Sequence, residues 1–188
     1  MQLSNLRDLL VEELRDLYSA ENQLLKALPK MAKAATSKPL KNGFTKHLKQ
    51  TEGHVNRLEK VFARLKASPR GKTCHAMEAL IKEGDELMKE DAEPEVLDAG
   101  LIAAAQRVEH YEIAAYGCVR TYAKLLGDKE SARLLDTTLK EEGATDKQLT
   151  KLAEKINVEA EDAEKHAPRK KKRKSKSFGE KVREAVGL

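Results

Sequence analysis

Apolar residues recur along most of this chain in alternating steps of three and four. Over about residues 3–35 the repeat runs through Leu3, Leu6, Leu10, Leu14, Leu17, Glu21, Leu24 and Leu28. Such spacing places about one side chain per turn on the same face of an α-helix. The segment is therefore predicted to be an amphipathic helix, with a bend at Pro29 because proline lacks a backbone N–H and its ring clashes with the preceding turn.

Four further segments continue this pattern, and turn-forming residues separate them. The breaks fall at Ser37–Pro39, Ser68–Gly71, Glu93–Pro94 and Gly127–Asp128. Helices are predicted from just after the first break to about residue 66, and over about residues 73–91, 95–126 and 129–156. Two long hairpins joined by a shorter segment are typical of a helical bundle with one crossover connection. The prediction is an all-α fold, a four-helix bundle with a short crossover helix between the second and third long helices.

Composition supports the helical prediction and divides the chain into two parts. The 188 residues contain no Trp and 4% aromatic residues, and Ala, Leu, Glu and Lys are abundant. The net charge is +5, but residues 163–188 carry ten Lys or Arg against three Glu, or +7, which leaves 5 − 7 = −2 for the rest. We expect a helical bundle over residues 1–160 and a basic, largely disordered tail over residues 161–188, with a short helix near its end at Phe178–Leu188.

Two sequence features bear on location. Cys74 and Cys118 lie in different predicted helices and do not have the spacing of a paired metal-binding motif, which fits a reducing compartment. No stretch approaches the roughly 20 apolar residues of a membrane span, and the first residues do not resemble a cleaved export signal. We expect a cytoplasmic protein that has no membrane partner.

In four predicted helices a carboxylate or a histidine occupies the apolar stripe, at Glu21, His54, Glu112 and Glu142. Burying an unpaired carboxylate costs several kcal/mol, so four helices that aim such groups at one interior suggest a shared counter-charge, most simply one or two metal ions. Each residue alone has an ordinary explanation, because a core carboxylate often pairs with lysine and a core histidine is often satisfied by its neighbours. The set as a whole favours a metal site.

The residue types indicate which metal the site would take. Carboxylate and imidazole together suit iron or manganese, whereas structural zinc normally recruits thiolate. Asp146, one turn after Glu142, is predicted to be a further ligand. Gln50, His47 and Glu109 border the same faces and are additional candidates.

Several strings carry a resemblance to a known family. They are Tyr18-Ser-Ala-Glu21-Asn-Gln-Leu, Cys74-His-Ala-Met77-Glu, Val108-Glu-His-Tyr-Glu112-Ile-Ala and Glu141-Glu-Gly-Ala-Thr-Asp146. Over about residues 3–157 the chain resembles the YciE/YciF stress-protein family of ferritin-like domains, and the string around Glu112 is the most specific part. The resemblance implies a ferritin-like bundle, related to rubrerythrin and the di-iron carboxylate proteins, that forms a homodimer.

The chain departs from the wider superfamily at two motifs. Relatives carry Glu-x-x-His in the second and fourth helices, where this chain has Thr51-Glu-Gly-His54 and Glu142-Gly-Ala-Thr145. The first keeps only the histidine and the second only the glutamate, with Asp146 as the substitute ligand, and Gln50 stands where relatives often have glutamate. The sequence therefore allows three interpretations of the site: a full pair of metal ions, a single or weakly held metal ion, and a metal-free polar network.

A bound metal pair would imply redox chemistry, in which open coordination positions let iron or manganese meet oxygen or peroxide. The expected activity is that of a di-metal oxidoreductase or a peroxide-consuming protein, in oxidative defence or metal handling. Tyr18 and Tyr116 have the helical phase to donate hydrogen bonds near the site, although half-buried aromatic residues are also common on ordinary helices.

The basic tail supports a different interpretation, in which the bundle is a non-enzymatic scaffold. Lysine and arginine runs bind phosphates by releasing counterions, and the absence of interleaved aromatic residues predicts no sequence specificity. A solubilising tail would have the same composition. The predicted phosphate contacts are Arg169, Lys170, Lys171, Lys172, Arg173, Lys174 and Lys176.

The tail interpretation can be tested by truncation. Deleting residues 165–188 should abolish salt-sensitive retention on DNA and leave thermal stability nearly unchanged, because the tail is not expected to join the core. Gel shifts at low and high salt, together with a melting curve, measure both effects. Failure of the full-length chain to shift DNA even at low salt would rule out nucleic-acid binding.

Overall fold

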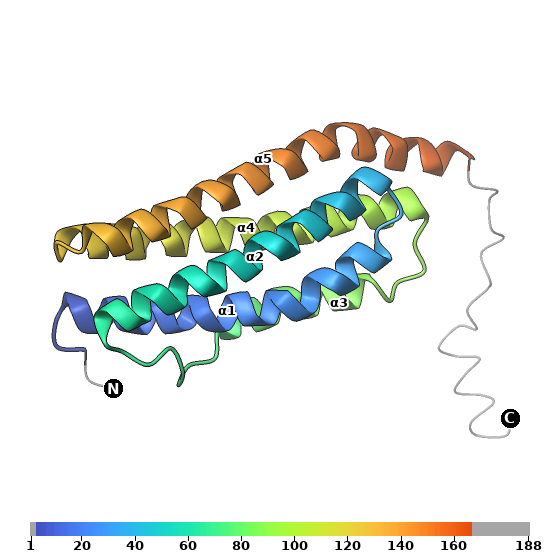
Figure 1. Cartoon of the computed structure of the whole chain (residues 1–188). Coiled ribbons are helices and arrows are strands. Elements are labelled where there is room, and N and C mark those ends of the chain that lie inside the picture. Colours follow the sequence, from blue (N-terminus) through green and yellow to red (C-terminus); the bar gives the residue numbers. More distant parts are fainter. Residues whose placement is uncertain (1–2, 167–188) are drawn as a thin grey trace, which may run out of the picture.

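The computed structural model describes residues 3–166 and contains five helices (Figure 1). They are α1 (Leu6–Ala34), α2 (Lys38–Leu65), α3 (His75–Leu87), α4 (Pro94–Leu125) and α5 (Lys129–His166). The predicted all-α bundle with a short crossover helix between the second and third long helices is confirmed. The predicted phosphate contacts of the tail and the short terminal helix lie outside the described residues.

The four long helices form two antiparallel hairpins, α1–α2 and α4–α5, which pack against each other (Figure 1). The two hairpins meet where α2 contacts α5 and α1 contacts α4. The crossover helix α3 packs on the outside of α1 and α4. Among the helices described, none combines the length and apolar character of a membrane-spanning segment.

The helix ends agree with the sequence signals, with one exception at the end of α5. Asn5 caps α1 by accepting a hydrogen bond from the backbone N–H of Asp8 at 3.0 Å, and Gly127 adopts a left-handed φ of 77° in the turn between α4 and α5. Helical geometry continues past Pro29 to the end of α1. Helix α5 extends ten residues beyond the predicted end at 156, because the segment 157–166 contains neither glycine nor proline and has three Glu and two Ala, which favour helix.

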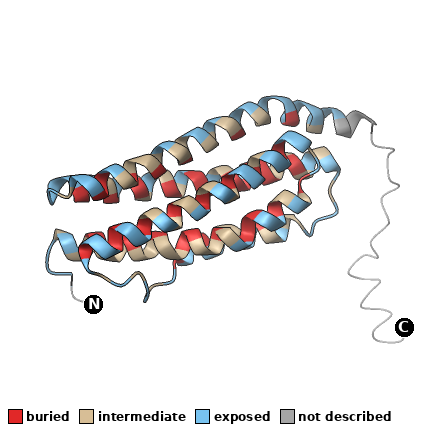
Figure 2. Ribbon diagram, in the orientation of Figure 1, coloured by how far each residue is buried: buried red, intermediate tan, exposed pale blue. Residues whose placement is uncertain are grey.

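The buried residues lie on the inward faces of the helices (Figure 2). They form two separate apolar clusters, one that includes Leu24, Phe44, Val108 and Leu149, and one that includes Leu10, Leu58, Tyr116 and Leu135. Along each long helix, the buried polar residues of the candidate site fall between members of the two clusters. The core therefore consists of two apolar halves separated by a polar layer.

A buried aspartate fastens the connection between α1 and α2 to α4. Asp98 is 2% exposed, and its carboxylate accepts hydrogen bonds from the N–H and hydroxyl of Thr36 and from the N–H of Ser37, at 2.8, 2.7 and 2.6 Å. This one carboxylate accepts from the backbone N–H of Ser37, the N-cap residue of α2, and from that of Thr36 just before it. The contact holds the two hairpins in register.

Replacing Asp98 should therefore cost substantial stability. We expect Asp98→Ala to lower the free energy of unfolding by about 2–4 kcal/mol, because it removes the buried charged acceptor that three donors share. Urea denaturation measures the change. The matched control is Asp85→Ala, whose exposed ion pair with Lys30 at 3.2 Å should contribute less than about 1 kcal/mol. A loss at position 98 no larger than that of the control would contradict the assigned role.

Candidate metal centre

Six ionisable side chains from the four long helices meet in the polar layer. They are Glu21 of α1, His47 and His54 of α2, Glu109 and Glu112 of α4, and Glu142 of α5, and each is between 0% and 4% exposed. They form two groups, His47 with Glu109, Glu112 and Glu142, and Glu21 with His54 and Glu142. Within each group, one ligand atom from every residue lies within 4.8 Å of the others. Glu142 belongs to both, so the groups are adjacent.

Helical spacing explains how short stretches of sequence supply these pairs. His47 and His54 are seven residues apart, and Glu109 and Glu112 are three apart, so each pair shares one face of its helix. Thr51 lies between the two histidines and donates its hydroxyl proton to the His47 carbonyl oxygen at 3.1 Å. The threonine is therefore occupied by its own backbone and leaves the histidines to face the neighbouring helices.

In the first group, His47 lies between α4 and α5. Its Nε2 is 3.2 Å from Glu109 Oε1 and 3.9 Å from Glu142 Oε2. Its Nδ1 lies 3.3 Å from the hydroxyl oxygen of Thr145. That hydroxyl donates its single proton to the Glu141 carbonyl oxygen at 3.1 Å, so it accepts from His47 Nδ1–H. This tautomer leaves the lone pair of Nε2 directed toward the carboxylates.

The second group repeats this arrangement around His54. Its Nδ1 lies 2.9 Å from Glu142 Oε1 and 3.3 Å from Glu21 Oε1. Its Nε2 lies 3.0 Å from Glu141 Oε2, and Arg57 forms a close ion pair with the same carboxylate oxygen. Because a carboxylate accepts, Nε2 carries the proton, and a neutral His54 has its lone pair on Nδ1. A carboxylate that orients a histidine in this way is a common feature of metal sites.

Most of the converging atoms have no hydrogen-bond partner among the described residues. The close contacts of the two histidine nitrogens with the carboxylates do not have hydrogen-bond geometry. Nearly all buried polar atoms in native proteins are paired, so such a concentration requires an explanation. The unpaired atoms are His47 Nε2, His54 Nδ1, Glu21 Oε2, Glu109 Oε2, both Glu112 oxygens and both Glu142 oxygens.

The electrostatics of the cluster are those of a site suited to a cation. Burial raises the pKa of Glu112 well above its usual value, and the neighbouring carboxylates Glu21, Glu142 and Glu109 raise it further. Burial and the nearby His54 lower the pKa of His47 to about 3, which keeps that imidazole neutral, as a metal ligand must be. Two divalent ions would balance the charges of the four carboxylates. The oxygen and imidazole donors therefore fit iron or manganese.

His54 responds differently because two carboxylates face it. Burial alone would lower its pKa, but the contacts with Glu142 and Glu21 outweigh that effect and raise the pKa to about 10. In the absence of metal, a proton on Nδ1 would partly replace the cation. Nδ1 of His54 is therefore an atom that could bind either a proton or a metal ion.

The remaining predicted site residues lie at different distances from the cluster. Tyr116 is buried and donates its hydroxyl proton to Glu21 Oε1 at 2.5 Å, whereas Tyr18 donates to Glu59 at 3.1 Å on a more exposed face. Gln50 is half-buried and lines a cavity beside the cluster. Asp146 belongs to neither group. Its side chain is 21% exposed and lies 3.2 Å from His110 Nε2.

Three residues that support the centre were not predicted from the sequence. They are Arg57, Glu141 and Thr145, which orient the two histidines as described above. Glu141 and Thr145 adjoin the stripe of α5 next to Glu142, and Arg57 is three residues after His54. Their closeness in sequence to a predicted ligand was the one signal that could have identified them. It is a weak signal, because polar residues at the edge of an apolar stripe usually face solvent.

Comparison with known proteins identifies the family. A family model described as a domain of unknown function, DUF892, matches residues 5–161. Protein YciF of Escherichia coli strain K12 is 44% identical over 163 residues, which make up 86% of this chain and 98% of YciF. The resemblance found in the sequence strings is confirmed.

Solved structures agree on the fold. The crystal structure of the E. coli stress protein YciF matches with a TM-score of 0.81 and 43% identity, and the match covers 83% of this chain and 99% of that one. A structure of ferritin-like, diiron-carboxylate proteins from Bacillus anthracis strain Ames matches with a TM-score of 0.63 over 80% of this chain and 99% of that one. Its identity of 18% supports the fold alone. The chain therefore belongs to the DUF892 family of YciF-like proteins and has a ferritin-like fold.

Proposed function

We propose that the bundle binds a pair of divalent ions, iron or manganese, and uses them in oxidative defence or metal handling during stress. The observation that carries this proposal is a set of eight buried carboxylate and imidazole atoms from all four long helices, none of which has a hydrogen-bond partner within residues 3–166. A metal-free polar network would leave these atoms unsatisfied at a cost of about 1–3 kcal/mol each, or more where they are charged.

The two groups assign the ligands. His47, Glu109 and Glu112 would hold one ion, and Glu21 and His54 the other. Glu142 would serve both because one of its oxygens approaches each histidine. This division keeps two ions within reach of a shared carboxylate. It also compensates for the superfamily motifs that are incomplete in this sequence, since His47 and Glu109 supply ligands from other positions.

The surrounding residues fix the orientation of the ligands in the metal-free protein. Glu141 and Arg57 hold His54 in one orientation, Thr145 does the same for His47, and Tyr116 holds Glu21 by a hydrogen bond. Burial excludes bulk water, which strengthens the attraction between the ligands and a cation. Iron or manganese bound there would supply redox and Lewis-acid chemistry.

The descriptions of similar proteins also support the proposal. The relative with 43% identity is described as a stress protein, and the more distant structural match is described as ferritin-like and diiron-carboxylate. Neither description assigns a reaction to this chain. They make a metal-dependent role under stress the simplest account of a buried acidic cluster in this fold.

Metal content of matched variants tests the proposal. We expect Glu112→Gln to lower iron or manganese affinity by at least about tenfold, because it removes a buried carboxylate that makes no hydrogen bond to the part of the chain that the structure describes, while preserving volume. The control is Asp146→Asn, which alters an acid outside both groups and should retain wild-type metal content. Elemental analysis and titration of the metal-free proteins provide the measurements. Equal metal content in wild type and Glu112→Gln would disprove the assigned centre.

The stability of the metal-free protein should fall as the pH rises from about 7 to about 9. Burial and neighbouring carboxylates raise the pKa of Glu112 and Glu109, and Glu142 and Glu21 raise the pKa of His54 to about 10 against the effect of burial. The folded protein therefore retains protons that the unfolded chain has already released, and it loses this stabilisation as the pH approaches the folded pKa values.

Urea unfolding across this pH range measures the effect. Glu112→Gln removes one of the titrating groups, so its stability should depend less steeply on pH than that of the wild type. Stability that rises over the same range in the metal-free wild type would show that the cluster holds no extra protons.

A further inference from the structure

Opposite sides of the bundle carry opposite charge. Residues 38–51 of α2 contain four lysines and no Asp or Glu, and residues 147–153 of α5 contain two lysines and no acid. Residues 75–95, which form α3 and its connection to α4, contain eight Glu or Asp against two Lys. Helix α3 packs on α1 and α4, whereas α2 and α5 contact each other (Figure 1). The acidic and basic segments therefore lie on opposite sides of the four-helix core.

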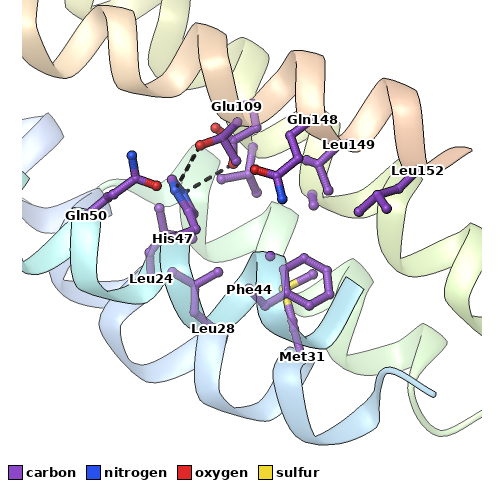
Figure 3. A pocket seen from close by; sticks show the side chains of 14 residues that line it. Leu24, Leu28, Met31, Phe44, His47, Gln50, Glu109, Gln148, Leu149 and Leu152 are labelled. Carbon is purple, nitrogen blue, oxygen red and sulfur yellow. Dashed lines mark hydrogen bonds and ion pairs between the residues drawn. The ribbon is translucent and has the colours of Figure 1, made fainter. Parts of the chain in front are cut away.

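The lysines of α2 and α5 form one exposed face. The two stretches lie at the same level of the bundle, since His47 Nδ1 is 3.3 Å from the Thr145 hydroxyl oxygen. Figure 3 shows Phe44, His47 and Leu149 directed from these stretches toward a cavity between the helices. The lysines project to solvent instead. They are Lys38, Lys41, Lys46, Lys49, Lys147 and Lys151, and we call them the lysine face.

The lysine face is not neutralised by the bundle. Among the described residues, none of its six lysines has an acidic side chain within ion-pair distance. Asp146 is next to Lys147 in the sequence, but its carboxylate lies against α4, 3.2 Å from His110 Nε2. Six like charges at close spacing repel one another and create a positive potential. An anionic partner would relieve that repulsion.

The surroundings of the lysines restrict the kind of anionic partner. Protein interfaces have apolar cores depleted of lysine, and helices that lie on membranes bury an apolar face. The large apolar side chains that are exposed in residues 3–166 lie outside both lysine-bearing stretches; they are Leu3, Val96, Leu125, Leu126 and Val158. Phe44, the aromatic residue within these stretches, is 2% exposed and cannot stack on an unpaired base. The phosphates of a double helix require only cations.

The dimensions of the lysine face also suit a double helix. Lys38 and Lys49 are eleven residues apart on α2, which is about 17 Å at 1.5 Å per residue. B-form DNA carries about one charge per 1.7 Å of its axis, so about ten phosphates lie along that length. The same phosphates repel the acidic side of the bundle, which favours approach with the lysine face forward.

We propose that the lysine face binds the phosphate backbone of duplex DNA without sequence preference. Binding there is independent of the metal centre, because none of the six lysines belongs to either group of ligands. Non-specific contacts of this kind have a Kd of roughly 10⁻⁴ to 10⁻⁶ M at physiological salt. The face alone is therefore too weak for a gel shift, and binding is measured in solution.

The salt dependence of DNA binding tests the proposal on the full-length chain. A triple variant with Lys46→Gln, Lys49→Gln and Lys151→Gln removes three charges from the face. Fluorescence anisotropy with a labelled duplex gives the slope of log affinity against log salt concentration. The slope should become shallower by about 3, because each lost phosphate contact removes roughly 0.9. Affinity at low salt should fall at least about tenfold, and the melting temperature should stay at the wild-type value.

A matched control removes the same charge from other faces. The variant with Lys26→Gln, Lys89→Gln and Lys124→Gln alters three exposed lysines of α1, the α3–α4 connection and α4. It should keep the wild-type slope and affinity. An unchanged slope in the face variant would overturn the proposal. Equal losses in both variants would overturn it too, because net charge alone would then explain binding.

Lysine acetylation of the wild-type chain provides a second measurement that needs no variant. Duplex DNA should protect Lys46, Lys49 and Lys151 from an acetylating reagent, read by mass spectrometry, and leave Lys26 and Lys89 reactive. Equal protection of both sets would contradict the assigned face.

Other polyanions complete the test. Tighter binding to single-stranded DNA, to duplex RNA or to vesicles of anionic lipid would assign the lysine face to that partner and overturn the proposal. Salt-sensitive self-association without DNA, lost in the face variant, would assign it to the acidic side of a second copy and would overturn it as well. Sedimentation of the wild type and both variants measures this.

Discussion

Four carboxylates buried together around two imidazoles are the constraint around which the rest of the structure is arranged. Such a cluster is unfavourable by itself, since burial and mutual repulsion both oppose its negative charge. The bundle tolerates it because two apolar clusters flank the polar layer and supply the packing that the layer cannot. The two apolar clusters thus supply packing stability, and the polar layer between them on the same four helices holds the ionisable groups.

Much of this arrangement could be predicted from the sequence, because helical periodicity is regular and glutamate in an apolar stripe is conspicuous. The structure brings Glu21, His54, Glu112 and Glu142 together as their helical phase indicates. Helix existence and order followed from the turn residues between apolar repeats. The end of α5 did not, because nothing in the polar segment after Ile156 stops a helix, and loss of apolar periodicity was a poor guide to termination.

The rest depends on how neighbouring helices are rotated, which one helix cannot show. Asp146 follows Glu142 by one turn, yet it lies beside His110 outside both groups, whereas His47 and Glu109 from the stripe edges lie inside. Residues near the border of an apolar face can turn either way, and the contact with the adjacent helix decides. The role of Glu141 could not be predicted either, since its partners His54 and Arg57 lie across the interface on α2.

Each hairpin carries only half of the donors. Helices α1 and α2 hold Glu21, His47 and His54, while α4 and α5 hold Glu109, Glu112 and Glu142. A nascent chain that has emerged from the ribosome only through its first hairpin therefore cannot assemble either group of ligands. Assembly of both groups must await docking of the second hairpin, so the polar layer is completed only late in the folding of the growing polypeptide.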